Sequence, residues 1–317
     1  MKPSTREQGL CAIGLPIRQL LIVLGLVATA YAAALLVWGE SPLASMARLG
    51  YVTGLQAAAL CLLNYGLRGL RWRLWMAHSG RNFGLLQGLR LYLAGYAFTP
   101  TPGNVGEAVR GLMLAHQPLG ARHSLAIFGA ERLADLLCLL LLCLPAAWWA
   151  WAHGLIKVAP AWLALAGVAV LMMAGLLLGL LFRFRHPLRR RLGWLQDAWA
   201  CLSVRPLVWF TLSLAAWAAQ GMAVWLICLA LGTAPGPLTA TGFYAVAMVA
   251  GALSALPAGL GGTEAVLTGL LVAHGATAAN ALAITVLTRL LTLWLAVAIG
   301  VMALLYSAAI TKEISFR

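Results

Sequence analysis

Long apolar segments alternate with short polar ones along nearly the whole chain of 317 residues. An apolar helix of about 18 residues or more is long enough to cross a bilayer. The pattern therefore predicts an all-α polytopic membrane protein with six spanning helices. These cover residues 19–39, 50–67, 122–150, 160–182, 206–232 and 279–308.

Two other apolar segments, residues 83–116 and 238–274, are each interrupted by prolines and glycines, which break helices. After the first break, residues 104–116 form a helix only about 20 Å long, shorter than the roughly 30 Å hydrocarbon core. We therefore predict two re-entrant helical hairpins, each entering and leaving on one side of the membrane. The breaks contain Pro100, Pro102, Gly103 and Gly106 in the first hairpin, and Pro257 and Gly259 in the second.

The two hairpins repeat one spacing of unusual residues. In each, a proline lies seven residues before a glutamate, and an arginine lies 25 residues after that glutamate. The chain has only eight acidic residues, so this spacing indicates an internal duplication. The copies are Pro100, Glu107 and Arg132, then Pro257, Glu264 and Arg289. We predict two repeats, residues 19–150 and 160–308, between a cytoplasmic N-terminal segment, 1–18, and a cytoplasmic tail, 309–317.

Charge distribution tests the orientation of these segments. The net charge is +14, although only 9% of the residues are charged. Loops on the cytoplasmic side of a membrane carry an excess of lysine and arginine. With the N-terminus in the cytoplasm, only Arg48 and Lys157 fall outside. The basic segments all fall inside: residues 1–18, 68–90, 183–205 and the C-terminal tail.

This orientation makes the two repeats inverted, because the first hairpin then enters from the cytoplasm and the second from outside. Inverted repeats with broken helices near the midplane are typical of secondary transporters. We expect a multi-pass protein of the bacterial cytoplasmic (inner) membrane with both termini inside. Trp194 would lie inside and Trp149 outside. The alternating arginines and tryptophans of residues 68–75 would lie at the cytoplasmic interface.

Several other kinds of site are not indicated by the sequence. The six cysteines show no C-x-x-C spacing, and the six histidines are scattered singly. We therefore expect neither a disulfide framework nor a metal site, and no cofactor. The positive charge lies in short loops between spans, where it serves orientation, so we expect no nucleic-acid partner.

The glutamates of the hairpins lie close to predicted helix starts. Asn104 is placed to be an N-cap with Glu107 three residues later, and Gly261 holds the same place before Glu264. One interpretation is that both glutamates only cap a helix. The other is that two helix N-termini direct partial positive charge at the bilayer middle, where they attract an anionic group.

Arg132 and Arg289 lie about 15 Å inside their predicted spans. An arginine at that depth must pair with another group or face a wet cavity. One interpretation is a pair of structural ion pairs, Glu107 with Arg132 and Glu264 with Arg289. Another is recognition of phosphate, which a guanidinium group binds with two parallel hydrogen bonds. The two interpretations are compatible.

Glu131 and Asp135 lie one helical turn apart beside Arg132, and their counterparts in the second repeat are Thr288 and Thr292. Only the first repeat carries these acids. That asymmetry fits a proton or cation site in one half, or an ion pair between Arg132 and Asp135. Both alternatives stay open at this point.

The motif Pro-Gly-x-x-Gly-Glu-x-x-Arg, followed by Glu-Arg-x-x-Asp and later by Pro-x-Gly-x-Gly-x-x-Glu, resembles a flippase-like membrane family. That family includes the transmembrane region of lysylphosphatidylglycerol synthases and the hopanoid-associated membrane proteins. The resemblance covers about residues 20–308 and implies movement of an amphipathic lipid between leaflets. The matching residues are Pro102, Gly103, Gly106, Glu107, Arg110, Glu131, Arg132, Asp135, Pro257, Gly259, Gly261 and Glu264. We expect no aminoacyl transfer, because the soluble domain of the synthases has no counterpart in this sequence.

The leading prediction is a lipid flippase and not an enzyme. Its substrate would be a lipid with an anionic phosphate, such as an aminoacyl-phospholipid or a polyprenyl-phosphate-linked sugar, or else a hopanoid-type lipid. A midplane site between the hairpins would use Asn104, Glu107, Arg110, Arg132, Gly261, Glu264 and Arg289.

Two alternatives remain. One is an intramembrane lipid-pyrophosphate phosphatase, although the first break offers only Thr99 and Thr101 and no serine. The other is a secondary transporter for a small solute or ion.

Overall fold

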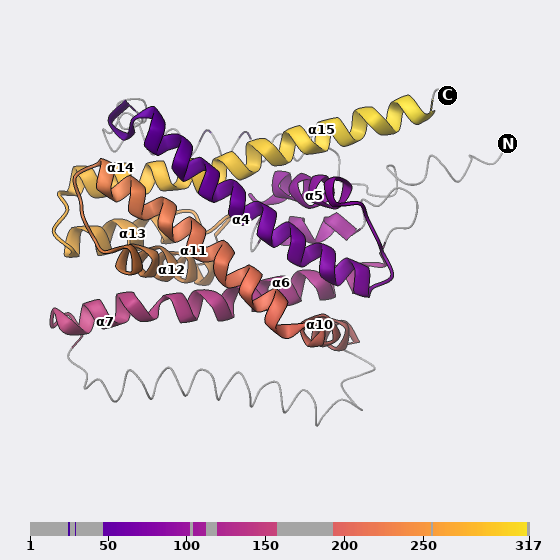
Figure 1. The fold of residues 1–317 in the computed structure, drawn as a ribbon, viewed down its shortest axis with the longest axis horizontal. Helices are drawn as coiled ribbons and strands as arrows, with labels where there is room; N and C mark the ends of the chain where they lie inside the picture. The colour runs from indigo at the N-terminus through magenta and orange to yellow at the C-terminus, as the bar shows by residue number, and fades with distance from the viewer. Residues whose placement is uncertain are drawn as a thin grey trace.

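The computed structural model describes residues 47–101, 104–111, 119–156, 193–254 and 256–315, with Gly25 and Thr29 in isolation. Every regular element in these ranges is a helix (Figure 1). The predicted spans 19–39 and 160–182, the basic residues 183–192 and the breaks at Pro102 and Gly103 lie outside the described residues.

Three described helical stretches are long and apolar enough to cross a membrane: Ala121–Ala152, Pro206–Ala230 and Ala278–Ser307. They coincide with three of the predicted spans, which confirms an all-α polytopic membrane protein. The number of six spans stays a prediction. The first stretch contains α6 (Ala121–Leu142) and α7 (Leu144–Ala152), and the second is α11.

The third stretch is interrupted immediately after Arg289. It begins as α14 (Ala278–Arg289), passes through a π-helical turn, Leu290–Trp294, and continues as α15 (Leu295–Ser315). A π turn leaves main-chain carbonyls without their usual partners. The hydroxyl of Tyr65 lies 2.9 Å from the carbonyl oxygen of Leu291 and 3.2 Å from that of Thr292, and donates to them.

Helix α4 (Tyr51–His78) is 28 residues long and packs along α11 for most of its length (Figure 1). It contains the predicted span 50–67 and continues beyond it. The predicted depth of residues 68–75 at the membrane interface stays a prediction, but four of their side chains face the protein interior and not lipid or water. Arg71 and Trp75 are fully buried, and Arg68 and Trp72 are nearly so. The two arginines pair with Asp135 on α6, Trp75 packs on Trp209 of α11, and Trp72 packs on Phe83 and Tyr92. The local alternation of basic and aromatic residues does not reveal these partners.

The first hairpin is formed by α5 (Leu85–Ala94), the 3₁₀ helix η1 (Gly95–Phe98) and a second 3₁₀ helix, η2 (Val105–Gly111). The prediction of an α-helical second arm over residues 104–116 is wrong for the part that is described. Asn104 takes a left-handed conformation with φ 55°, and the chain then winds as a 3₁₀ helix. In a 3₁₀ helix, residues three apart eclipse each other, so Glu107 and Arg110 lie on one face.

The second hairpin matches its prediction more closely. It consists of α12 (Pro237–Leu253) and α13 (Gly262–Ala273). Between them the chain bends at three residues with positive φ: Ala258 at 53°, Gly259 at 67° and Gly261 at 83°. Glycine adopts these values without steric cost. The break predicted at Pro257 and Gly259 therefore lies where the backbone reverses.

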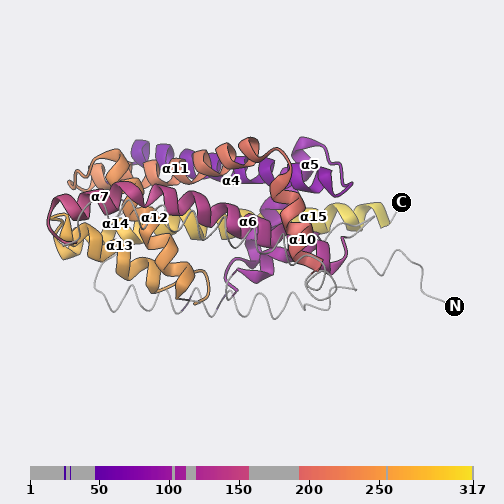
Figure 2. The same ribbon diagram turned by 90° about the horizontal axis from the view of Figure 1, so that it is seen from below.

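Each hairpin packs against the last helices of the other half (Figures 1 and 2). The first hairpin meets α15, where a side chain at Gly300 would collide with the backbone of Tyr96 and Ala97. The second meets α6 and α7, where a side chain at Gly242 would collide with Ala146. Small residues allow such close approach of membrane helices. Two inverted repeats would produce this arrangement, in which each hairpin packs against the other half. The division into repeats stays a prediction.

Candidate functional site

Seven ionised side chains from α4, the first hairpin and α6 lie together in the interior. We call this group the charge network: Arg68, Arg71, Glu107, Arg110, Glu131, Arg132 and Asp135. Six of the seven side chains are at most 8% exposed, and Arg132 is 30% exposed. Charges at membrane depth are costly unless they pair with one another, so the network must be closely paired to persist.

Asp135 on α6 is held by donors from three directions. Its Oδ2 lies 2.8 Å from Nη2 of Arg68, and its Oδ1 lies 2.7 Å from Nη1 of Arg71. The indole nitrogen of Trp217 donates to Oδ1 across 3.1 Å. Nη2 of Arg132 is 3.4 Å from Oδ2, so the predicted pair between Arg132 and Asp135 is present, though it is the longest of the three ion pairs.

Glu107 is bound mainly by its own hairpin. Its Oε2 is 2.7 Å from Nη2 of Arg110, and its Oε1 accepts a hydrogen bond of 2.8 Å from the hydroxyl of Thr99. The predicted pair with Arg132 is present at 3.4 Å. Arg110 is therefore the principal partner of Glu107, because the 3₁₀ turn places the two side chains on the same face.

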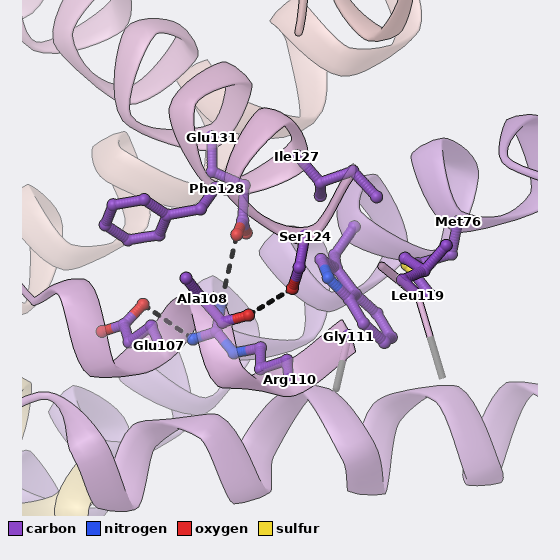
Figure 3. A pocket seen from close by; sticks show the side chains of 11 residues that line it. Met76, Glu107, Ala108, Arg110, Gly111, Leu119, Ser124, Ile127, Phe128 and Glu131 are labelled. Carbon is purple, nitrogen blue, oxygen red and sulfur yellow. Dashed lines mark hydrogen bonds and ion pairs between the residues drawn. The ribbon is translucent and has the colours of Figure 1, made fainter. Parts of the chain in front are cut away.

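Arg110 also connects the hairpin to α6. Its Nη1 lies 3.1 Å from Oε2 of Glu131 (Figure 3). Its guanidinium carbon lies 4.2 Å from the ring centre of Tyr92 and 5.3 Å from that of Tyr96. Such cation–π contacts stabilise a cation that has left water. Gly95 makes the room, since a side chain there would collide with that of Arg110.

The network carries more positive than negative charge. It contains four guanidinium groups and three carboxylates, so one positive charge has no counter-charge within it. The only interaction of Arg71 with Glu131 is an ion pair of 3.7 Å, too long for a hydrogen bond. Oε1 of Glu131 and Nη2 of Arg71 thus lack hydrogen-bond partners among the described residues.

The second hairpin holds a separate and simpler ion pair. Nε of Arg289 lies 2.7 Å from Oε1 of Glu264, and both side chains are at most 6% exposed. Nη2 of Arg289 donates to the main-chain carbonyl of Ala258 across 2.8 Å, inside the hairpin break. The predicted pair is therefore confirmed. Gly261 precedes α13 as predicted, and Glu264 lies in the first turn of that helix.

Asn104 directly precedes η2, as predicted for a cap residue, although its φ of 55° differs from the extended conformation usual at an N-cap. Its main-chain carbonyl accepts a hydrogen bond of 3.0 Å from the amide of Glu107. Gly106 lies inside η2. Pro100 forms part of the turn after η1, with Thr101 donating its hydroxyl to the carbonyl of Phe98.

A small pocket opens beside the network, between the end of α4, η2 and the first turns of α6 (Figure 3). It is lined by Glu107, Arg110 and Glu131 of the network and by apolar side chains, among them Ile127 and Phe128. Its interior volume of about 10 Å³ has room for roughly one water molecule. The pocket gives a polar point of contact next to the buried charges, but it is too small for a headgroup in this conformation.

A scan against protein families matches the model of the lysylphosphatidylglycerol synthase TM region over residues 21–300. The chain belongs to this family. A comparison with curated proteins gave no match. The family match confirms the resemblance found in the sequence motifs, and it covers almost the whole chain.

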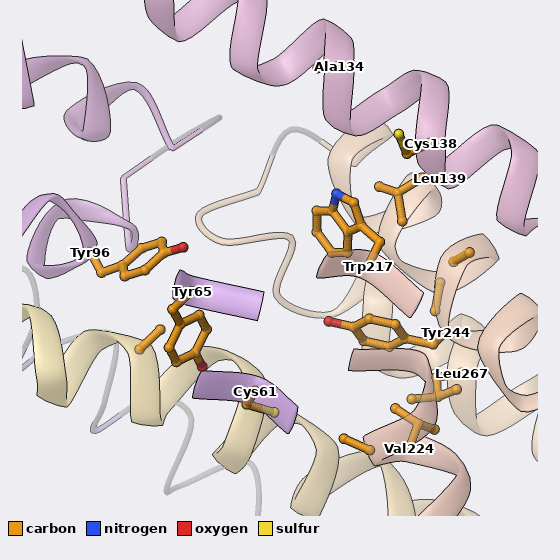
Figure 4. Close-up of a cluster of buried hydrophobic side chains, with 14 of the residues drawn as sticks. Cys61, Tyr65, Tyr96, Ala134, Cys138, Leu139, Trp217, Val224, Tyr244 and Leu267 are labelled. Atoms are coloured by element: carbon orange, nitrogen blue, oxygen red, sulfur yellow. The ribbon is translucent and has the colours of Figure 1, made fainter. Parts of the chain in front are cut away.

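In this member of the lysylphosphatidylglycerol synthase TM region family, the buried core next to the charge network is rich in aromatic residues. Figure 4 shows Tyr65 and Tyr96, from α4 and η1, and Trp217 and Tyr244, from α11 and α12. Trp217 also donates to Asp135, and Tyr244 donates to the side-chain oxygen of Gln220 across 3.0 Å. The charge network therefore borders an aromatic core.

Sequence reasoning missed Arg68 and Arg71 as members of the site. Their spacing of three residues places them on one face of a helix that already carries the span 50–67. That spacing was the available signal. Sequence reasoning also grouped Glu264 and Arg289 with the residues of the first hairpin in one site. Among the described residues, no ion pair or hydrogen bond joins this pair to the charge network.

Proposed function

We propose that this protein is a lipid flippase, which moves an amphipathic, phosphate-bearing lipid between the two leaflets. Its family, that of the lysylphosphatidylglycerol synthase TM region, suggests an integral membrane protein that acts on lipid. The observation that carries the proposal is the charge network, with one positive charge left over inside an apolar helical bundle. Ionisable residues at membrane depth mark substrate or ion pathways in transport proteins.

An anionic phosphate is the group that suits this site best. Guanidinium groups bind phosphate through two parallel hydrogen bonds, and the network supplies the charge to balance it. An aminoacyl-phospholipid and a polyprenyl-phosphate-linked sugar both present such a group. A hopanoid-type lipid without phosphate would leave the surplus charge unbalanced. Transport through the interior between the two hairpins is part of the same proposal.

Hydrolysis of a lipid pyrophosphate is the competing enzymatic function. The hydroxyl of Thr99 is already hydrogen-bonded to Glu107, and that carboxylate is bound by Arg110, so it does not act as a free base. We therefore propose transport without catalysis. Small-solute or ion transport is the third possibility, and the vesicle measurement below distinguishes all three.

We predict that the protein is located in the bacterial cytoplasmic membrane, with both termini inside the cell. In this orientation α10 (Gly193–Ser203), which packs on α6, lies on the cytoplasmic side, and His153 lies outside. Single cysteines at the exposed positions 153 and 203, in a chain without its own cysteines, can be labelled from either side. Labelling of position 203 from outside would reverse the orientation.

The direct test uses purified protein in vesicles that contain a trace of fluorescent phosphatidylglycerol. A membrane-impermeant reductant bleaches label in the outer leaflet only, so flipping shows as bleaching of the inner-leaflet label. We expect flipping with the protein, and a loss of about tenfold or more in Arg110→Gln, because hydrogen bonds to charged groups contribute about 1.5–3 kcal/mol each.

The matched control is Arg122→Gln on the same helix as Glu131. Arg122 is 56% exposed and pairs with Asp197 at 2.8 Å, away from the network. Its loss should leave flipping unchanged. Phosphate release from a lipid pyrophosphate in the same vesicles would favour the phosphatase. Uptake of a solute without lipid movement would favour the third function.

A further inference from the structure

Arg132 differs from the other arginines of the charge network in both exposure and contacts. Its side chain is 30% exposed, whereas those of Arg68, Arg71 and Arg110 are at most 8% exposed. Each of those three makes an ion pair of 3.1 Å or less. Arg132 reaches its two carboxylates only at 3.4 Å.

Both oxygens that face Arg132 are already occupied by closer partners. Oε2 of Glu107 lies 2.7 Å from Arg110, and Oδ2 of Asp135 lies 2.8 Å from Arg68. Without Arg132, the network would hold three guanidinium groups and three carboxylates. The surplus positive charge therefore resides on Arg132, the member that can be reached from outside the network.

The surroundings of Arg132 leave it ready for an anion. Its guanidinium carbon lies 5.2 Å from the ring centre of Phe128, one turn earlier on α6, and that ring lines the pocket beside Glu131 (Figure 3). Nε of Arg132 is buried and has no hydrogen-bond partner among the described residues. The same is true of Nε in Arg68, Arg71 and Arg110. What sets Arg132 apart is its 30% exposure, through which a phosphate can approach the guanidinium group.

We propose that Arg132 binds the headgroup phosphate and that the network selects headgroups whose phosphate carries one negative charge. This inference rests on the proposed function. A phosphodiester balances the surplus charge of the network. A phosphomonoester or pyrophosphate brings a second negative charge, which would remain unpaired in a medium where unpaired charges are costly.

The experiment compares fluorescent lipids with identical acyl chains in neutral vesicles. The probes are phosphatidylglycerol, a phosphodiester; phosphatidic acid, a phosphomonoester; and a glucosylceramide without phosphate. At pH 8 we expect phosphatidylglycerol to flip about tenfold faster than the other two, since one charge-assisted hydrogen bond changes binding by about an order of magnitude. Phosphatidic acid should speed up at pH 5, where its phosphate holds one charge, because the second pKa of such a group is about 6.

Variants of Arg132 test whether this residue causes the preference for phosphatidylglycerol. In Arg132→Gln, flipping of phosphatidylglycerol should fall about tenfold and the preference over glucosylceramide should disappear. Arg132→Lys should restore flipping in part, because lysine keeps the charge without the planar fork. Arg122→Gln is the matched control, and the unfolding temperature of each variant reports whether it folds.

The outcomes separate this inference from the proposed function. A wild type that flips none of the lipids defeats the proposed function. A wild type that flips phosphatidylglycerol and phosphatidic acid equally at pH 8, or an Arg132→Gln variant that flips as the wild type does, overturns the inference alone. If Arg132→Gln does not fold, the pH dependence of phosphatidic acid flipping in the wild type decides, with phosphatidylglycerol as the reference at both pH values.

Discussion

The same spacing of glutamate and arginine gives two different ion pairs in the two halves. Glu264 and Arg289 meet at 2.7 Å, and the only other group that Arg289 binds among the described residues is a main-chain carbonyl. Glu107 and Arg132 are separated by 3.4 Å, because Arg110 takes the nearer position. Arg289 is held by its glutamate, whereas Arg132 lies farther from its glutamate because Arg110 is the closer partner.

The difference comes from the neighbouring helices. The first half adds Glu131 and Asp135 on α6, and α4 brings Arg68 and Arg71 to meet them. In the second half α11 has no charged residue. The second half therefore holds an isolated ion pair, whereas the first half holds a network with four guanidinium groups and three carboxylates. A repeated motif does not carry the same role in both copies when its surroundings differ.

The largest expected effect is on the closed pair. Arg289→Gln leaves Glu264 buried and without its cation, which typically costs about 3–5 kcal/mol of folding stability. Glu264→Gln should be similarly destabilising. The double variant should lose less than the two single losses combined, because it strands no charge. Thermal unfolding in detergent measures this coupling, and strictly additive losses would show that the two residues do not interact.

A second comparison concerns two glycines that lie against buried polar side chains, one in each half: Gly95 beside Arg110 and Gly251 beside Thr263. Gly95→Ala would push against Arg110, which two carboxylates and two tyrosines hold in place, so we expect a loss of about 1–3 kcal/mol. Gly251→Ala would push against the hydroxyl of Thr263, which has no described partner and can rotate away. Its loss in thermal unfolding should be smaller. Equal losses would contradict the expectation that Arg110 yields less easily than Thr263.

The smallest effect is expected for Arg132→Gln. The side chain is partly exposed and its ion pairs are long, so stability should change by about 0–1 kcal/mol. The same variant is expected to lose most of its flipping. A loss of stability as large as that of Arg289→Gln would remove the contrast between the two halves.

Much of the fold was predictable from local sequence. Spans 122–150, 206–232 and 279–308 followed from apolar length, and the second break followed from Pro257 and its glycines. The pair of Glu264 and Arg289 was predictable because these are the only acidic residue and the only arginine or lysine between positions 206 and 311 of the sequence.

The site of the first half was less predictable. Arg68 and Arg71 stand among tryptophans, a pattern that also suits a membrane interface, and their partner Asp135 lies more than 60 residues later in the chain. The 3₁₀ helix η2 packs against η1 and α6. Local sequence does not specify either of these tertiary contacts.

The π-helical turn at Leu290–Trp294 has a consequence for aligning the two halves. Each π turn contains one residue more than an α turn, whereas the matching stretch of α6 is regular. Leu136 and Leu293 lie four residues after Arg132 and Arg289, respectively, yet they do not point in equivalent directions, because Leu136 is exposed and Leu293 is buried. Deleting one residue from this turn would rotate the rest of the helix by about 100°. Gly300 would then leave its contact with the first hairpin, so this single turn sets how the C-terminal helix packs against that hairpin.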